Sequence, residues 1–312
     1  MIVTVTPNPS IDRTVRVPRL VRGEVNRSSM PSSEAAGKGL NVSRALHLHG
    51  IETLAVLPMA ADSATTYLRL LGDAVPVAPV PIAGTIRTNL TVLEADGTVT
   101  KINEPGPEVR EADMDALTGS ADVPAAWIVG SGSLPPGAPV DFYARLARLR
   151  SNDRRIAVDS SGAALRTCLS ADVDLIKPNV SELEQLVRAP LETLGEVLGA
   201  AQSLVTARLR ALLVSLGPDG ALYVDRDDAV HAEASATDVV NTVGAGDALL
   251  AGYLASGGGP GAVAAAVAWS VAAIRSTGTW MRRVGPADTA AVRVHPEIER
   301  ARPLHRALVA AT

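Results

Sequence analysis

One pattern occurs three times in the stretch from Ala126 to Val187, which has the sequence AWIVGSGSLPPGAPVDFYARLARLRSNDRRIAVDSSGAALRTCLSADVDLIKPNVSELEQLV. A short apolar run is followed by a turn and then by a segment with helical character. The runs are Ala126–Gly130, Arg155–Val158 and Val173–Ile176. Apolar strands separated by helices are typical of a parallel sheet covered on both faces, because right-handed crossovers place the helices there. We therefore predict a doubly wound, mostly parallel α/β fold.

The same alternation continues on both sides of this stretch. Further strands are expected at Ile2–Thr6, Thr53–Pro58 and Ala211–Ser215. Helices are expected at Leu40–His49, Pro139–Arg150, Ser181–Val187, Leu194–Ala207, Asp247–Ala255 and Ala262–Ile274. Since no linker rich in Pro, Gly or Ser divides the chain, we expect residues 1–312 to form a single domain.

Two segments, at about 13–34 and 85–104, break the alternation. In the second, TIRTNLTVLEADGTVTKIN alternates apolar and polar residues on either side of an Asp96-Gly97 turn. The two segments should pair into a small sheet outside the main layer, a β lid. An apolar face on this sheet, with Leu90, Val92 and Val99 as candidates, has too little domain of its own to cover it. We therefore expect a homodimer joined through the lid.

Composition excludes several classes of protein. The 312 residues carry 29 basic and 33 acidic side chains without long runs of like charge, which does not suit nucleic acid or an anionic membrane. The longest apolar run, Ala262–Ile274, falls short of the roughly 20 residues that a membrane helix needs. The start MIVTVTPN has no export features, and the single Cys168 fits a reducing compartment, so we expect a cytoplasmic protein.

A glycine-rich turn in the segment VNTVGAGDALLAGY, residues 240–253, runs directly into an apolar helix. The first N–H groups of a helix have no partner within it and lie at the positive end of the helix dipole. The glycines around Ala245 would let an anion approach these groups, and Asp247 is placed to accept a proton from a hydroxyl that attacks the anion. The alternative is an aspartate that the dipole alone favours in a first turn.

A second glycine-rich turn, in AAGKGLNVSRAL at residues 35–46, also opens a helix. Gly37 allows close approach of a ligand, Lys38 offers a charge, and Asn41 offers both a donor and an acceptor to a hydroxyl. Upstream, TPNPSID at residues 6–12 places Asp12 at the carboxyl edge of the sheet, where open α/β sheets bind ligands. The structural alternatives are a simple turn for the glycines and an Asx turn for Asp12.

Polar residues also follow two later strands. Asn179 and Glu182, in IKPNVSE, have the spacing of a helix cap. The same two side chains at a strand's carboxyl end could instead hold the hydration shell of Mg²⁺ beside a triphosphate. The segment SLGPDG, residues 215–220, predicts by itself only a turn.

Taken together and in this order, these motifs resemble the ribokinase-like (PfkB) family of carbohydrate kinases over essentially the whole chain. AAGKGLNVSRAL and VNTVGAGDALLAGY are similar to the two patterns of that family. The segments TPNPSID, RGEVNR, IRTN, GSLPPG, VDSSG, IKPNVSE and SLGPDGA look like the branch that phosphorylates sugar phosphates, above all the 1-phosphofructokinases. In similar 6-phosphofructokinases the turn that here contains Lys38 is often all glycine.

The resemblance implies a kinase that uses ATP and Mg²⁺. It places the ATP phosphates over Gly244, Ala245 and Gly246, makes Asp247 the base, and puts Mg²⁺ near Asn179 and Glu182, through water. The adenosine would lie against Lys177, Ser215, Gly217, Gly220 and Thr242.

The resemblance also implies a sugar-phosphate site. It assigns the sugar to Asp12, Gly37, Lys38 and Asn41, and the existing phosphate to Arg87, Asn89 and Ser133. Close relatives often carry another arginine two positions before Arg87, where this chain has Thr85. The hold on the phosphate is then either looser here or completed by Arg27.

Two rival functions are compatible with these motifs, and a third lacks its motif. Within the same chemistry, the acceptor would be fructose 6-phosphate or tagatose 6-phosphate in place of fructose 1-phosphate. A sugar-phosphate-binding regulator without turnover would not need the base Asp247. For a redox enzyme, the dinucleotide pattern fails, because GSGSLP at residues 130–135 ends in proline where a glycine is required.

Overall fold

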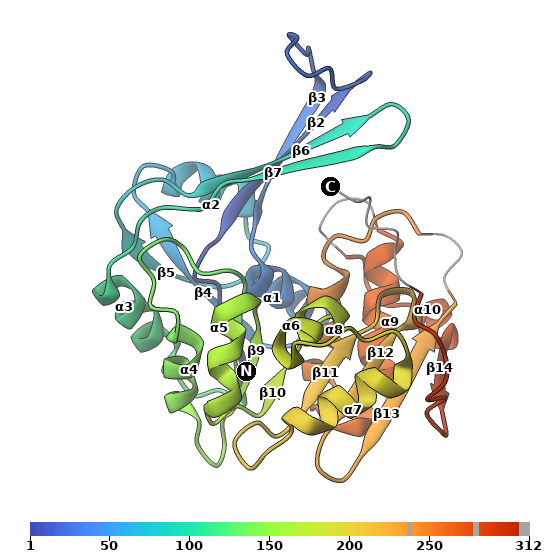
Figure 1. Ribbon diagram of the computed structural model, residues 1–312. Coiled ribbons are helices and arrows are strands. Elements are labelled where there is room, and N and C mark those ends of the chain that lie inside the picture. The colour runs from blue at the N-terminus through green and yellow to red at the C-terminus, as the bar shows by residue number, and fades with distance from the viewer. Residues whose placement is uncertain (236–238, 277–280, 306–312) are drawn as a thin grey trace.

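The computed structural model describes residues 1–235, 239–276 and 281–305, and within them the main sheet contains ten strands (Figure 1). Their order is β14-β13-β12-β11-β10-β9-β8-β1-β4-β5. The strands are β1 (Ile2–Val5), β4 (Thr53–Ala60), β5 (Val77–Ile82), β8 (Trp127–Ser131), β9 (Arg155–Asp159), β10 (Leu175–Ile176), β11 (Leu212–Ser215), β12 (Ala221–Val224), β13 (Ala229–Ala234) and β14 (Val292–His295).

The sheet is parallel from β5 to β11, and β12, β13 and β14 are added antiparallel at one edge. Strand β1 lies between β4 and β8, so the chain reverses its direction of travel across the sheet at this point. Ligands of open α/β sheets bind at the carboxyl ends of the strands beside such a reversal. The predicted doubly wound fold is confirmed, and it fixes where the site should lie.

Two apolar clusters pack on opposite faces of the sheet. One face is covered by α1 (Lys38–Leu48), α8 (Ala245–Ala255) and α9 (Val263–Ile274), and the other by α3 (Glu111–Ala121), α4 (Phe142–Leu146), α5 (Gly162–Thr167), α6 (Val180–Val187) and α7 (Leu194–Leu204). Two further helices are α2 (Ala64–Leu71) and α10 (Pro286–Ala290). Among the described residues, no helix is both long enough and apolar enough to span a membrane.

The lid is a second sheet of four strands within the described residues, in the order β3-β2-β6-β7. It is formed by β2 (Ser10–Val17), β3 (Ser29–Ala36), β6 (Arg87–Glu94) and β7 (Val99–Asn103), and it projects away from the main sheet (Figure 1). Strands β2 and β6 pair in parallel, which sets Asp12 beside Asn89 and Ser10 beside Arg87. The two segments that break the α/β alternation therefore pair as predicted.

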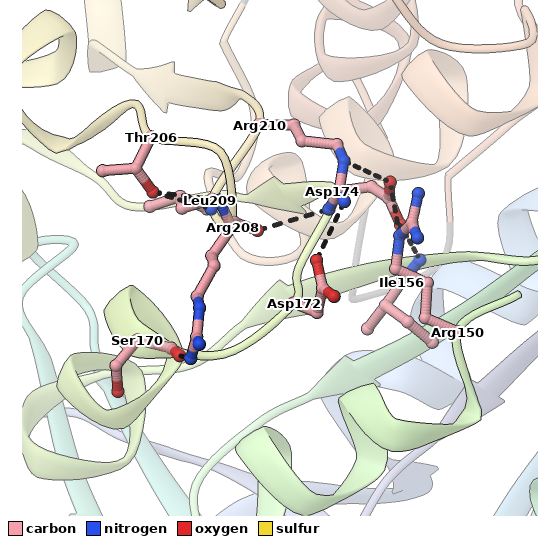
Figure 2. Close-up of polar contacts among 9 residues, drawn as sticks. All are labelled: Arg150, Ile156, Ser170, Asp172, Asp174, Thr206, Arg208, Leu209 and Arg210. Carbon is pink, nitrogen blue, oxygen red and sulfur yellow. Dashed lines mark hydrogen bonds and ion pairs between the residues drawn. The ribbon is translucent and has the colours of Figure 1, made fainter.

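A polar network closes the amino edge of the central strands (Figure 2). The buried Asp174 carboxylate accepts hydrogen bonds from the Ile156 amide at 2.8 Å and from Arg150 Nε at 3.0 Å. Arg210 lies beside it and pairs with Asp172 at 2.8 Å. These contacts hold the start of β10, which has only two residues, between β9 and β11.

Several predicted boundaries are wrong. The strand expected at Val173–Ile176 begins at Leu175, because Asp174 turns its side chain into the edge network. The helix expected at Pro139–Arg150 is α4 followed by a 3₁₀ turn, Ala147–Leu149. The helix expected to reach Ala207 ends at Leu204.

Candidate active site

A polar cavity of about 340 Å³ lies between the lid and the carboxyl ends of the central strands. It gathers most of the residues that the resemblance assigns to the sugar and to catalysis. Its lining consists of Ser10, Asp12, Gly37, Lys38, Asn41, Arg87, Asn89, Asp159, Lys177, Asn179, Glu182, Ser215, Val243, Gly244, Gly246 and Asp247. Residues more than 200 positions apart in the chain thus line one cavity.

The start of α8 lines this cavity with Gly244, Gly246 and Asp247. Gly244 precedes the helix with φ 79°, a left-handed conformation that glycine adopts without strain. The amides of the first turn have no acceptor within the helix and lie at its positive end. A Cβ at Gly246 would stand 3.4 Å from Lys177 Nζ, so the ammonium group lies over the same turn. Amides and ammonium in this arrangement could hold an anion such as phosphate.

Asp247 lies in this first turn with 7% of its surface exposed. Asn41 Nδ2 donates a hydrogen bond to Asp247 Oδ2 at 2.9 Å, which orients the carboxylate. Burial, followed by the nearby Asp159 charge, raises the pKa of Asp247 to about 6, against the opposing effect of Lys38. A carboxylate with a pKa near neutrality is well suited to accept a proton from an attacking hydroxyl.

Asp159 is a site residue that the sequence analysis did not assign. It ends β9, is 1% exposed, and its two oxygens pair with Lys38 Nζ and Lys177 Nζ, each at 3.1 Å. Burial disfavours the Asp159 anion, but the two ammonium groups outweigh burial and hold its pKa below the ordinary value. In turn, the Asp159 charge raises the pKa of Lys38. The only sequence feature that could have indicated Asp159 is its position at the end of an apolar strand, in the segment VDSSG.

The lid side of the cavity holds a second polar group. Asn89 Nδ2 donates to Asp12 Oδ1 at 2.9 Å and to Ser10 Oγ at 3.0 Å, so the lid strands β2 and β6 share one network. Arg87 donates to the backbone oxygens of Asn8 at 3.2 Å and Glu104 at 3.1 Å. Among the described residues, Arg87 Nε has no hydrogen-bond partner. Burial lowers the pKa of Arg87, and pairing with an anion would offset that burial.

Two residues expected to help hold the sugar's phosphate lie apart from this cavity. Ser133 is exposed and connects to the site through Asn8, whose Nδ2 donates to Ser133 Oγ at 3.3 Å. Arg27 lies exposed between β2 and β3 and does not line the cavity. Asn8 itself was missed by the sequence analysis, because an asparagine between two prolines has the composition of a turn.

A larger, mostly apolar cavity of about 470 Å³ adjoins the polar one and shares Asn179, Ser215 and Gly246 with it. Its lining includes all the residues expected to contact adenosine except Lys177, which lines the polar cavity instead. The apolar side chains are Pro218, Ala234, Val239, Ala245, Leu249, Val267 and Ile274. The first turn of α8 therefore lies where the two cavities meet.

Asn179 and Glu182 form a reciprocal cap at the start of α6. Asn179 Oδ1 accepts from the Glu182 amide at 2.8 Å, and Glu182 Oε2 accepts from the Asn179 amide at 2.9 Å. Across the described residues, no cluster of three His, Cys, Asp or Glu side chains could enclose a metal ion. The structural alternative for this pair is thus realised, and both residues still line the polar cavity.

Fold and site together define the class of this protein. The doubly wound sheet with its β lid, and the buried carboxylate at the start of α8, fit a ribokinase-like phosphotransferase that acts on an alcohol group. The sequence profile of the pfkB family carbohydrate kinases matches residues 5–280, and the chain belongs to that family.

Named relatives and solved structures agree. The chain is 40% identical to a 1-phosphofructokinase of Haloferax volcanii, over 82% of this chain and 84% of the relative. It is 36% identical to an ATP-dependent 6-phosphofructokinase isozyme 2 of Mycobacterium tuberculosis, over 80% of this chain and 76% of the relative. The crystal structure of phosphofructokinase-2 from Escherichia coli in complex with potassium superposes with a TM-score of 0.85 at 32% identity, covering 93% of this chain and 96% of that one.

Proposed function

We propose that this kinase transfers the γ-phosphoryl group of ATP to the 6-hydroxyl of fructose 1-phosphate, giving fructose 1,6-bisphosphate and ADP. One observation carries the proposal. The buried Asp247 stands between an anion-binding turn and a polar cavity whose lid side holds the arginine Arg87. That arrangement suits an acceptor with a hydroxyl at one end and a phosphate at the other.

The adenosine occupies the apolar cavity in this proposal, against Ser215, Gly217, Gly220 and Thr242. The phosphates of ATP extend over Gly244, Ala245 and Gly246 toward Lys177, at the junction of the two cavities. The sugar is held by Asp12, Gly37, Lys38 and Asn41, and its own phosphate by Arg87 and Asn89, with Ser133 approached through Asn8.

The chemical step needs little beyond charge stabilisation and one proton acceptor. The 6-hydroxyl oxygen forms a bond to the γ-phosphorus, the bond from that phosphorus to the β–γ bridging oxygen breaks, and ADP leaves with the electron pair. Asp247 takes the hydroxyl proton. The first-turn amides and Lys177 stabilise the negative charge on the transferred group.

The residues present fit a hydrated Mg²⁺ shared with the nucleotide but do not fit an ion enclosed by protein. Glu182 offers a carboxylate oxygen beyond the one that caps α6, and Asn179 lines the same cavity. Mg²⁺ commonly keeps several waters and binds through one or two carboxylates plus substrate phosphates. When bound there, it would neutralise charge on the β- and γ-phosphates.

Two observations favour the 1-phosphate over the 6-phosphates. Lys38 interrupts the glycine turn that holds the sugar, and Asp159 fixes its ammonium group in the polar cavity. In addition, the 1-phosphofructokinase named above is somewhat more similar to this chain than the 6-phosphofructokinase. Fructose 6-phosphate and tagatose 6-phosphate remain the alternative acceptors of the same site.

Product analysis tests the proposal. With ATP, Mg²⁺ and fructose 1-phosphate, ³¹P NMR should show one new C6 phosphomonoester for each ATP converted to ADP. ATP consumed without a sugar product would contradict the proposal. Binding of both ligands without turnover would support the alternative of a non-catalytic regulator.

We also propose that the protein is a cytoplasmic homodimer in which each chain is a single kinase domain, and the lid supports the dimer. Ile102 on β7 is 57% exposed and Val99 is 52% exposed, so apolar side chains remain uncovered in the monomer. The predicted apolar face needs correction, however. Leu90 pairs with Ile102, whereas Val99 pairs with Leu93. Because side chains alternate along a strand, these two pairs lie on opposite faces of the lid. Val92 is already buried within the chain.

A further inference from the structure

The loop that follows β11 forms one wall of the apolar cavity. Gly217, Pro218 and Gly220 line that cavity, whereas Asp219 between them does not. Asp219 is 1% exposed, so its carboxylate is directed away from the cavity into the protein. The loop also packs tightly against β13. A Cβ at Gly220 would overlap the carbonyl oxygen of Ala232, so there is no room for a side chain at this position.

The buried carboxylate is held from the C-terminal part of the chain. Asp219 Oδ1 accepts from Arg302 Nη2 at 2.9 Å and from His305 Nδ1 at 2.7 Å, and Oδ2 accepts from the His305 amide at 2.7 Å. Across the described residues, Arg302 is the only arginine or lysine paired with Asp219. A buried carboxylate that loses its cation destabilises the protein, so this pair helps to hold the loop, together with the hydrogen bond between His231 Nε2 and the Asp219 backbone oxygen at 2.8 Å.

Arg302 is itself fixed from two sides. Its Nη2 also pairs with Glu233 Oε2 on β13 at 2.6 Å. Its backbone oxygen accepts a hydrogen bond from the Leu194 amide, at the start of α7, at 2.9 Å. The Leu304 amide donates to the backbone oxygen of Glu192, also at 2.9 Å. The guanidinium group therefore approaches Asp219 from a segment attached to both α7 and β13.

We propose that Arg302 is a positioning residue for the nucleotide: through Asp219 it sets the wall Gly217–Gly220 of the apolar cavity. We call the contact between Arg302, His305 and Asp219 the C-terminal clasp. The clasp touches neither nucleotide nor sugar and acts only on the shape of the nucleotide wall. This inference rests on the proposed function, since it takes the apolar cavity as the adenosine site.

The decisive variants are Arg302→Gln, which removes the charge, and Arg302→Lys, which keeps it. Loss of the charge should raise the Kd for ADP, measured by calorimetry without sugar, by about tenfold or more, as small displacements of positioning groups can do. The KM for ATP should rise in parallel, while the KM for the sugar phosphate stays within about twofold of wild type. Arg302→Lys should recover most of the nucleotide affinity.

Arg154→Gln is the matched control, because Arg154 pairs with Asp122 at 2.6 Å and lines neither cavity. It should leave both KM values unchanged. If Arg302→Gln does not fold, Asp219→Asn carries the test, since it keeps the side-chain shape and removes the charge. Its Kd for ADP should rise several-fold.

A folded Arg302→Gln or Asp219→Asn variant with the wild-type Kd for ADP would overturn the clasp and leave the kinase proposal intact. Equal rises in both KM values would show a general structural effect and would also overturn it. A wild-type chain that binds neither ADP nor ATP would contradict the proposed function, and the clasp with it.

Discussion

At the scale of single residues, Asp247 combines two properties that are hard to reconcile outside an active site. It is buried at the positive end of a helix and hydrogen-bonded by Asn41, yet its pKa is raised to about 6. Burial and Asp159 disfavour its anion, whereas Lys38 and Lys177 limit the rise. The result is a carboxylate that is ionised at neutral pH and still basic enough to take a proton.

We predict that Asp247→Asn lowers kcat by 10²-fold or more, the scale of lost general-base catalysis, and leaves the Kd for ATP nearly unchanged. The fold should persist, because burial of the ionised carboxylate disfavours folding at pH 8 and the neutral amide does not carry this cost. Steady-state kinetics with calorimetry and thermal melting measure all three quantities. A variant that retains more than about a tenth of the wild-type kcat would remove Asp247 from the role of base.

The pH dependence supplies the control for this prediction. Since Asp247 must be ionised to accept a proton, the wild-type kcat/KM should fall about tenfold per pH unit below pH 6 and level off above pH 7. The residual rate of Asp247→Asn should show no such step between pH 5 and 7. The same step in the variant would assign the titration to another group.

Arg87 tests the other end of the polar cavity. Arg87→Ala should raise the KM for the sugar phosphate by 10² to 10⁴, because charge-assisted hydrogen bonds to a phosphate would be lost, and should leave the KM for ATP within a few-fold. Thr88→Ala, one residue along β6 and facing the opposite side of the strand, is the matched control. Equal effects of Arg87→Ala on both substrates would place the phosphate elsewhere.

At the scale of elements, helices α8 and α9 show how packing shapes the apolar cavity. Gly252 on α8 lets α9 approach closely, because a Cβ there would lie 2.7 Å from Trp269 Cγ and 2.9 Å from the Ala265 oxygen. Leu249 and Val267 of the same two helices line the apolar cavity. The distance between these helices therefore affects both the stability of the fold and the shape of the apolar cavity.

We predict that Gly252→Ala lowers the free energy of unfolding by about 1–3 kcal/mol, the usual cost of overpacking. Gly199→Ala is the matched control, because Gly199 is exposed on α7 and a Cβ there meets nothing within 4 Å. It should raise stability by about 0.5–1 kcal/mol through helix propensity. Chemical denaturation measures both, and a stabilised Gly252→Ala would contradict the packing account.

Elements that follow hydrophobic pattern were predictable, and those set by tertiary pairing were not. The central strands are apolar on both faces, so their sequence alone indicates them. Strand β12 has only four residues, and β13 carries polar residues whose partners lie elsewhere in the chain: His231 bonds to the Asp219 backbone oxygen and Glu233 pairs with His295 on β14. Strand β5 contains two prolines, which argue against a central strand and fit its place at the opposite edge.

The residues of the candidate site also fall into those that the sequence could predict and those that it could not. Glycine turns before helices, together with the family resemblance, identified Gly244, Asp247, Lys38 and Asn41, which all line one cavity. Asp159 was missed because its role depends on two lysines that approach it from distant turns. Such a group emerges only once the fold brings its members together.

At the scale of the whole molecule, the lid leaves the apolar side chains of Val99 and Ile102 exposed. We predict a homodimer, so light scattering at micromolar concentration with substrate should give twice the chain mass of 32.2 kDa. Ile102→Asp, which places a charge on the exposed lid, should shift the mass toward the monomer. A monomeric mass for the wild-type chain would count against the lid interface.

The preference of this kinase for fructose 1-phosphate is measured by kcat/KM for fructose 1-phosphate, fructose 6-phosphate, tagatose 6-phosphate and free fructose, determined side by side with ATP as the phosphoryl donor. We expect fructose 1-phosphate to exceed both 6-phosphates by at least about tenfold, and free fructose to fall behind by about 10² to 10⁴ because Arg87 is then left without an anion. A tenfold or greater preference for either 6-phosphate would contradict the assignment.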